Sequence, residues 1–182
     1  SDANKFKAAF NVLQSLIQDN QIVAGHDVGS GGLITTLLEM TFAGINSGAE
    51  FRLDHLTETD SIKLLFAENV GIVFQAKLGQ EESIISAFNE VAVPCVRIGK
   101  FKSGGTVSIV NGKDSFTLDV LKLRDIWYKT SYLLDIRQSG QNHAQARFSN
   151  YKNQALHFDF PNHFTGKLPE IPSDGRIKAA II

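Results

Sequence analysis

The sequence has few of the features that mark secreted, membrane-spanning or nucleic-acid-binding proteins. Its single cysteine, Cys95, excludes a disulfide within the chain, and we expect a reducing, cytoplasmic compartment. No apolar run approaches the roughly 18 residues that a membrane span needs, and no leader-like segment opens the chain. Eighteen basic and 19 acidic residues leave a formal net charge of −1, without a basic stripe. We therefore expect no nucleic-acid partner and no membrane partner.

The residues that are present suit one globular domain. The chain has 182 residues, of which 43% are hydrophobic and 20% charged, close to the average for soluble proteins. Proline is scarce, and three of the four prolines fall after residue 156, at Pro161, Pro169 and Pro172. Because proline interrupts helices and strands, we expect no regular element over residues 156–172, and we interpret this segment as an extended arm.

Before the arm, apolar periodicity predicts alternating helices and strands. Helices are expected over residues 5–18, from Leu33 to a left-handed C-cap at Gly44, after a cap at Thr57 or Thr59, over 123–137, and after a cap at Asn142. One more is expected before Pro94, with Ile84, Ile85, Phe88 and Val91 on its buried side. Strands are expected over residues 22–24, 50–53, 71–78, 106–110 and 115–120. Asn111-Gly112 lies between the last two and predicts a hairpin with a type I′ turn.

The stretch GHDVGSGGLITTLLEMTFAG, residues 25–44, places glycines directly before a helix. Backbone N–H groups at a helix start have no intrahelical partner, and glycines let a phosphate approach them closely. Gly29, Ser30, Gly31 and Gly32 form such a turn, and Asp27 just before it could hold Mg²⁺ against the phosphate. The alternative is that the glycines serve tight packing alone and Asp27 caps the helix or the turn. The spacing matches neither a Walker A motif nor GxGxxG.

Other candidate residues favour structural roles, and no catalytic residue is predicted. His26 has no nucleophile or second metal ligand at a useful spacing, so we interpret it as a hydrogen-bonded structural residue. Glu39 is expected in a salt bridge or an interface, and Trp127 as an aromatic anchor of the core on the same helix as Arg124. Cys95 lies among apolar neighbours, where we expect an inert, buried thiol.

Three segments in order resemble the phosphoribosylformylglycinamidine synthase family. Residues 25–44 look like its HD-x-S-x-GGL…LxEMxFAG segment, and residues 123–132, LRDIWYKTSY, are similar to its LR-x-x-W-x-x-T stretch. The last residues, RIKAAII at 176–182, resemble the first strand of its glutaminase domain.

The resemblance implies an α/β (α+β) fold of the AIR-synthase C-terminal type, a sandwich with a mixed β-sheet between helix layers that is partly ferredoxin-like. It divides the chain into this domain over residues 1–155, an arm or linker over 156–175, and the first strand of a truncated glutaminase domain over 176–182. The partners implied are other domains of the same polypeptide, an AIR-synthase-like N-terminal half and the glutaminase domain.

The activity implied is that of a ligase of purine biosynthesis, which uses ATP and glutamine to amidate formylglycinamide ribonucleotide. In that family this domain helps to enclose an auxiliary nucleotide, ATP or ADP, with Mg²⁺. Asp27 matches a metal ligand and Gly29 a nucleotide contact. The fragment itself would be inactive. The alternatives are a purely structural packing module, or the C-terminal domain of another ATP-using relative such as a selenophosphate synthetase.

One departure from the family pattern affects the site. Better-known bacterial relatives have Arg-Ser-Asp where this chain has Val28-Gly29-Ser30, so a hydroxyl at residue 29 and a carboxylate at residue 30 are missing. Asp27 keeps its carboxylate. Metal binding is therefore expected at Asp27, and nucleotide binding through the backbone of residues 29–32 rather than through side chains.

Overall fold

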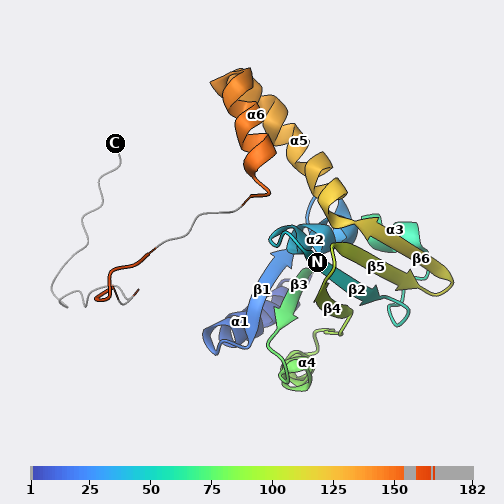
Figure 1. Ribbon diagram of the computed structural model, residues 1–182. Helices are drawn as coiled ribbons and strands as arrows, with labels where there is room; N and C mark the ends of the chain where they lie inside the picture. Colours follow the sequence, from blue (N-terminus) through green and yellow to red (C-terminus); the bar gives the residue numbers. More distant parts are fainter. Residues whose placement is uncertain (1, 154–158, 165, 167–182) are drawn as a thin grey trace.

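The computed structural model describes residues 2–153, 159–164 and 166, which contain six helices and six strands (Figure 1). The helices are α1 (Ala3–Gln18), α2 (Gly32–Phe42), α3 (Ser61–Phe66), α4 (Glu81–Glu90), α5 (Val120–Ser139) and α6 (Gln141–Asn150). The strands are β1 (Ile22–Asp27), β2 (Ser47–Arg52), β3 (Ile72–Ala76), β4 (Gly99–Ser103), β5 (Thr106–Asn111) and β6 (Asp114–Asp119). None of the described helices is long and apolar enough to cross a membrane.

The strands form two sheets. The larger sheet has the order β4-β2-β5-β6, in which β2 and β5 run parallel and the other neighbours run antiparallel. The smaller sheet is the antiparallel pair β1 and β3. The α/β class with mixed strand directions is thereby confirmed.

Two apolar clusters hold these layers together. The main cluster joins α2 and α3 to the four-stranded sheet, where Phe51, Val107 and Ile109 are buried against Leu37 and Leu65. On β5 buried and half-buried residues alternate, as expected for a strand with one face on the core. A smaller cluster of Leu16, Ile84 and Phe88 packs α1 and α4 beside the β1–β3 pair. The glycine-rich loop connects β1, whose Ile22 packs on the smaller cluster, to α2, whose Leu37 belongs to the main cluster.

The β5–β6 hairpin is confirmed, but the predicted type I′ turn is wrong. Asn111 pairs with Asp114, so the connecting residues are Gly112 and Lys113, and of these only Gly112 has a positive φ, of 60°. Asn111 is instead buried, and its amide donates to the backbone oxygen of Thr59 at 3.3 Å and to Ser61 Oγ at 3.1 Å. These bonds satisfy a buried amide and hold Asn111 in the strand.

Three predicted caps are also wrong. The carboxylate of Asp60, rather than Thr57 or Thr59, accepts the N–H groups of Ile62 and Lys63 at the start of α3. Asn142 lies inside α6, which begins after Gly140. Gly44 does not adopt a left-handed conformation, and the C-cap of α2 is Ala43, which has a right-handed φ of −63°. In each case, local spacing located the element but misplaced its boundary by a few residues.

Helices α5 and α6 form an antiparallel pair that projects from the sheets (Figure 1, yellow to orange). Stacked rings join them, with Tyr132 and Phe148 centroids 4.6 Å apart and Tyr128 and Tyr151 centroids 4.7 Å apart. An ion pair between Arg147 and Asp135 adds to the contact. Most of the predicted arm at 156–175, and all of the predicted strand at 176–182, lie outside the described residues.

Candidate functional site

The glycine-rich loop connects the end of β1 to the start of α2. Its position is fixed by two hydrogen bonds: Val28 N–H donates to the Gly71 oxygen at 2.9 Å, and Thr36 Oγ1 donates to the Asp27 oxygen at 2.9 Å. Gly31 is the N-cap of α2, and no side chain caps the helix there. The interpretation of Asp27 as a helix cap is therefore wrong, and its side chain is 81% exposed.

Gly31 and Gly32 are required by the fold itself. Their φ angles are 88° and 74°, in the left-handed region that glycine adopts without strain. A Cβ on Gly31 would collide with the Thr35 hydroxyl, and a Cβ on Gly32 would lie 2.6 Å from the backbone carbon of Phe66. For these two glycines the packing interpretation is sufficient.

Gly29 and Ser30 are under no such constraint. Neither has a positive φ, and a Cβ on Gly29 would meet only Asp27 Oδ2, at 3.6 Å. Within the described residues, the N–H groups of Gly29 and Ser30 donate to no acceptor. Gly32 N–H donates to the Gly29 oxygen at 3.0 Å. Two N–H groups next to an exposed carboxylate are thus available at the positive end of the α2 dipole.

The third N–H group of the loop already has an anionic partner, which the sequence did not reveal. Gly31 N–H donates to Glu68 Oε1 at 2.9 Å. Glu68 follows α3 and lies 37 residues from Gly31 in the sequence, so no local motif joins the two residues. A carboxylate at this point indicates that the start of α2 accommodates negative charge.

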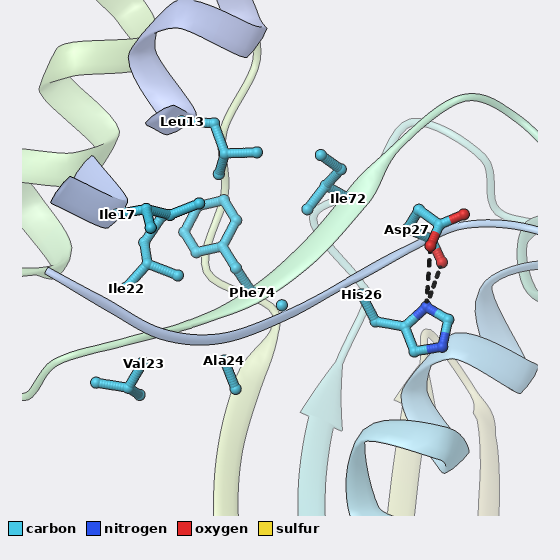
Figure 2. Close-up of a pocket in the computed structure, with 10 residues that line it drawn as sticks. Leu13, Ile17, Ile22, Val23, Ala24, His26, Asp27, Ile72 and Phe74 are labelled. Carbon is cyan, nitrogen blue, oxygen red and sulfur yellow. Dashed lines mark hydrogen bonds and ion pairs between the residues drawn. The ribbon is translucent and has the colours of Figure 1, made fainter. Parts of the chain in front are cut away.

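His26 and Glu39 are confirmed as parts of the scaffold. His26 Nδ1 lies 2.7 Å from the Asp27 backbone oxygen and 3.5 Å from Asp27 Oδ1 (Figure 2). On the other side of the ring, Nε2 lies 2.8 Å from Glu39 Oε2, and Glu39 Oε1 accepts the Trp127 indole N–H at 2.6 Å. Through both ring nitrogens, His26 joins the end of β1 to α2.

A metal would need ligands beyond those that the described part of the chain brings together. Among the described residues, no group of three or more His, Cys, Asp or Glu side chains is arranged to hold a metal ion. Asp27 offers one exposed carboxylate, which suits Mg²⁺ as a single oxygen ligand. The remaining ligands would come from a nucleotide, from water or from another part of the polypeptide.

An apolar groove of about 400 Å³ borders Asp27 along β1 (Figure 2). The side chains of Leu13, Ile17, Val23, Ile72 and Phe74 line it, and Val23 and Ile72 are half or more exposed. This face of the small sheet is therefore open next to the candidate site.

The remaining candidates are scaffold residues. Trp127 is 50% exposed, so the prediction of a core anchor is wrong, although its ring packs on Phe42 at 5.6 Å. Cys95 is half-buried, and burial raises the pKa of its thiol, which disfavours a reactive thiolate.

Comparison with known proteins gives the family. Residues 1–111 match the family described as AIR synthase related protein, C-terminal domain, and the chain belongs to that family. It is similar to phosphoribosylformylglycinamidine synthases: 39% identical over 132 residues to the enzyme of Schizosaccharomyces pombe and 33% over 135 residues to that of Homo sapiens. These alignments cover 70% and 72% of this chain but only 10% of each relative. The resemblance seen in the sequence is confirmed, and the chain spans about a tenth of its relatives' length.

Solved structures agree on the fold. The chain is similar to phosphoribosylformylglycinamidine synthase II of Thermotoga maritima, with a TM-score of 0.60, 15% identity, and coverage of 68% of this chain and 22% of that one. T. maritima PurL complexed with ADP gives the same TM-score, identity and coverage. T. maritima PurL complexed with FGAR gives a TM-score of 0.57 at 17% identity, covering 64% of this chain and 20% of that one. At these identities the likeness concerns the fold.

Proposed function

We propose that this chain is a non-catalytic segment of a phosphoribosylformylglycinamidine synthase and contributes part of an auxiliary Mg²⁺–nucleotide site. The observation that carries the proposal is the juxtaposition of the exposed Asp27 carboxylate with the available N–H groups of Gly29 and Ser30. The relatives named above, and the ADP complex of T. maritima PurL, support this assignment.

The chemistry of the residues suits a nucleoside di- or triphosphate. The N–H groups of Gly29 and Ser30 would donate to a phosphate oxygen, and the dipole of the 11-residue helix α2 adds to the attraction. Asp27 would hold Mg²⁺, which neutralises phosphate charge when bound. Because residue 29 carries no hydroxyl and residue 30 no carboxylate, binding relies on the backbone and on Asp27.

No residue of this site is assigned a catalytic role. His26 has both ring nitrogens engaged, and the raised pKa of Cys95 does not suit a glutamine-hydrolysing nucleophile. The ATP- and glutamine-dependent amidation of formylglycinamide ribonucleotide would therefore require the rest of the polypeptide, and we expect the isolated chain to be inactive.

The proposal is tested by calorimetric titration of Mg-ADP into a longer polypeptide that also contains the preceding domain. Asp27→Asn should weaken binding about tenfold or more, since it removes a charged oxygen ligand. Asp19→Asn is the matched control, because Asp19 is an exposed aspartate at the far end of α1. If both variants bind Mg-ADP like the unmodified protein, Asp27 is not a ligand.

A purely structural module is the second candidate. The observations in its favour are the packing requirement at Gly31 and Gly32 and the Glu68 carboxylate on Gly31 N–H. If the chain is only a structural module, every loop variant that folds should bind Mg-ADP like the unmodified protein.

A further inference from the structure

A second groove, of about 380 Å³, lies where α5 and α6 meet the C-terminal end of α2. Its lining consists of Glu39, Phe42, Ala43, Arg124, Trp127, Tyr128 and Tyr151. Most of this lining is aromatic. Arg124 is different, because it is a charged residue that is only 4% exposed.

The guanidinium of Arg124 is only partly satisfied. Its Nη1 donates to the Phe42 backbone oxygen at 2.8 Å, and its Cζ lies 5.0 Å from the centroid of the Tyr151 ring. Its Nε and Nη2 are buried and make no well-aligned hydrogen bond, although the guanidinium lies near enough to the Tyr151 hydroxyl to act against the rise in the pKa of that group. Buried donors without a partner are unfavourable, so a missing acceptor is indicated. The N–H groups of Nε and Nη2 point in the same direction along one edge of the guanidinium. In this geometry an arginine can donate two parallel hydrogen bonds to one carboxylate.

The other charges around the groove already have partners. Glu39 is held by the Trp127 indole and by His26. Asp125 accepts from the Lys152 ammonium at 2.6 Å and from the Tyr151 hydroxyl. Burial by itself would raise the pKa of Asp125, but these hydrogen bonds outweigh it and the pKa lies below its ordinary value. Arg124 forms no direct ion pair among the described residues, although its charge also helps to lower the pKa of Asp125.

We propose that this groove receives an Asp or Glu side chain from another segment of the longer polypeptide. The carboxylate accepts from Nε and Nη2 of Arg124, and the aliphatic stem packs against Phe42 and Trp127. Tyr151, which follows α6 and lies over the guanidinium, shifts to admit it.

Two observations favour a protein segment over a small anion. Trp127 of the groove also belongs to an apolar stripe of α5 at helical spacing, in which Ile126, Trp127, Leu133 and Leu134 are each about half or more exposed. Such a surface gains stability by being covered, which a free anion does not achieve. The relatives are about ten times as long as the matched region, so the polypeptide has ample chain to supply the segment.

The first experiment uses Trp127 as the reporter, because it is the single tryptophan of the sequence and lines the groove. N-acetyl-glutamate amide is titrated into the chain, with N-acetyl-glutamine amide and inorganic phosphate as parallel probes. We expect a saturable change of fluorescence with the glutamate probe. The response should be at least about tenfold weaker in Arg124→Lys, which keeps the positive charge but loses the two parallel N–H donors of the guanidinium. Arg137→Lys, an exposed arginine on the same helix, is the control. An equal response to the glutamine probe, or tighter binding of phosphate, overturns the proposal.

The second experiment examines the longer polypeptide and decides the question if the small probe binds too weakly. In a Cys95→Ser background, Ala43→Cys places a thiol in the lining of the groove. Labelling of that residue, measured on its peptide by mass spectrometry, should be at least about tenfold slower in the longer polypeptide than in this chain. Arg124→Lys should restore much of the rate, and Thr130→Cys serves as the exposed control. Equal rates in both proteins overturn the proposal without bearing on nucleotide binding at Asp27.

Discussion

The two ends of helix α2 differ in how their backbone groups are satisfied. At the N-terminal end, glycines bring the backbone close to α3, and the N–H groups of Gly29 and Ser30 remain available beside Asp27. At the C-terminal end, a buried arginine from α5 covers the Phe42 carbonyl, and an aromatic groove surrounds it. In the proposals above, the first end would receive a phosphate and the second a carboxylate. The comparison teaches that one helix can have backbone donors before its first turn and a side-chain donor at its last carbonyl.

The largest effect is expected at Gly32, where the N-terminal end depends most strongly on glycine. Gly32→Ala combines a φ of 74° with a Cβ placed 2.6 Å from the Phe66 backbone. We expect a loss of about 3 kcal/mol or more in the free energy of unfolding, measured by urea denaturation. Gly79→Ala is the control, because φ is 83° there but nothing lies within 4 Å, and it should cost only about 1–2 kcal/mol. Equal losses of stability in the two variants would show that the close contact between Gly32 and the Phe66 backbone does not restrict residue 32.

Glu39 joins the two ends, so its removal should weaken both. Glu39→Ala breaks the contact with His26 Nε2 and the bond from the Trp127 indole. We expect a loss of about 1–3 kcal/mol in the free energy of unfolding. We also expect a red shift of the Trp127 emission, because the indole loses its hydrogen bond to Glu39 and becomes more exposed to water. A double-mutant cycle with His26→Ala isolates their coupling, which should exceed about 0.5 kcal/mol. Strict additivity would mean that the two side chains act independently.

Lowering the pH should reduce the stabilising contribution of Asp125, which lies on α5 near the C-terminal end of α2. Its pKa is lower in the folded protein, so its contribution to stability is present above the unfolded pKa of about 3.9 and is lost as pH falls through the folded value. Asp125→Asn should therefore be less stable than the unmodified chain at pH 7, and the gap should narrow below about pH 4. Because the carboxylate is partly exposed, the gap should stay under about 1 kcal/mol. A gap that does not vary with pH would exclude the ion pair with Lys152 as its source.

The smallest effect on stability is expected at Gly29. Gly29→Ser places a side chain where only Asp27 Oδ2 is near and φ is not positive, so stability should change by less than about 0.5 kcal/mol. If the site takes a nucleotide, the added hydroxyl should tighten Mg-ADP binding in the longer polypeptide. Gly29→Ala is the control, since it adds the Cβ without the hydroxyl. A large destabilisation would show that residue 29 is as constrained as Gly32.

The sequence predicted what depends on local periodicity and missed what depends on distant contacts. Spacing of apolar residues located α1, α2 and the β5–β6 hairpin, because each buries a regular face. It could not locate the turn after Asn111, whose buried amide bonds to residues 50 and 52 positions away. In the candidate site, the loop and Asp27 were visible as a motif. The contact of Glu68 with Gly31 and that of Arg124 with the Phe42 carbonyl could not be predicted, since they join residues 37 and 82 positions apart.

The contacts through Glu39 also join the α5–α6 pair to the candidate site. Helix α5 has 20 residues and is about 30 Å long, and it projects away from the sheets (Figure 1). Near its base, three short contacts run in series from the Trp127 indole to Glu39, from Glu39 to His26, and from His26 to the backbone of Asp27. The base of the helix pair is therefore connected to the backbone beside the Asp27 carboxylate through side chains alone, although Trp127 and Asp27 lie 100 positions apart in the sequence.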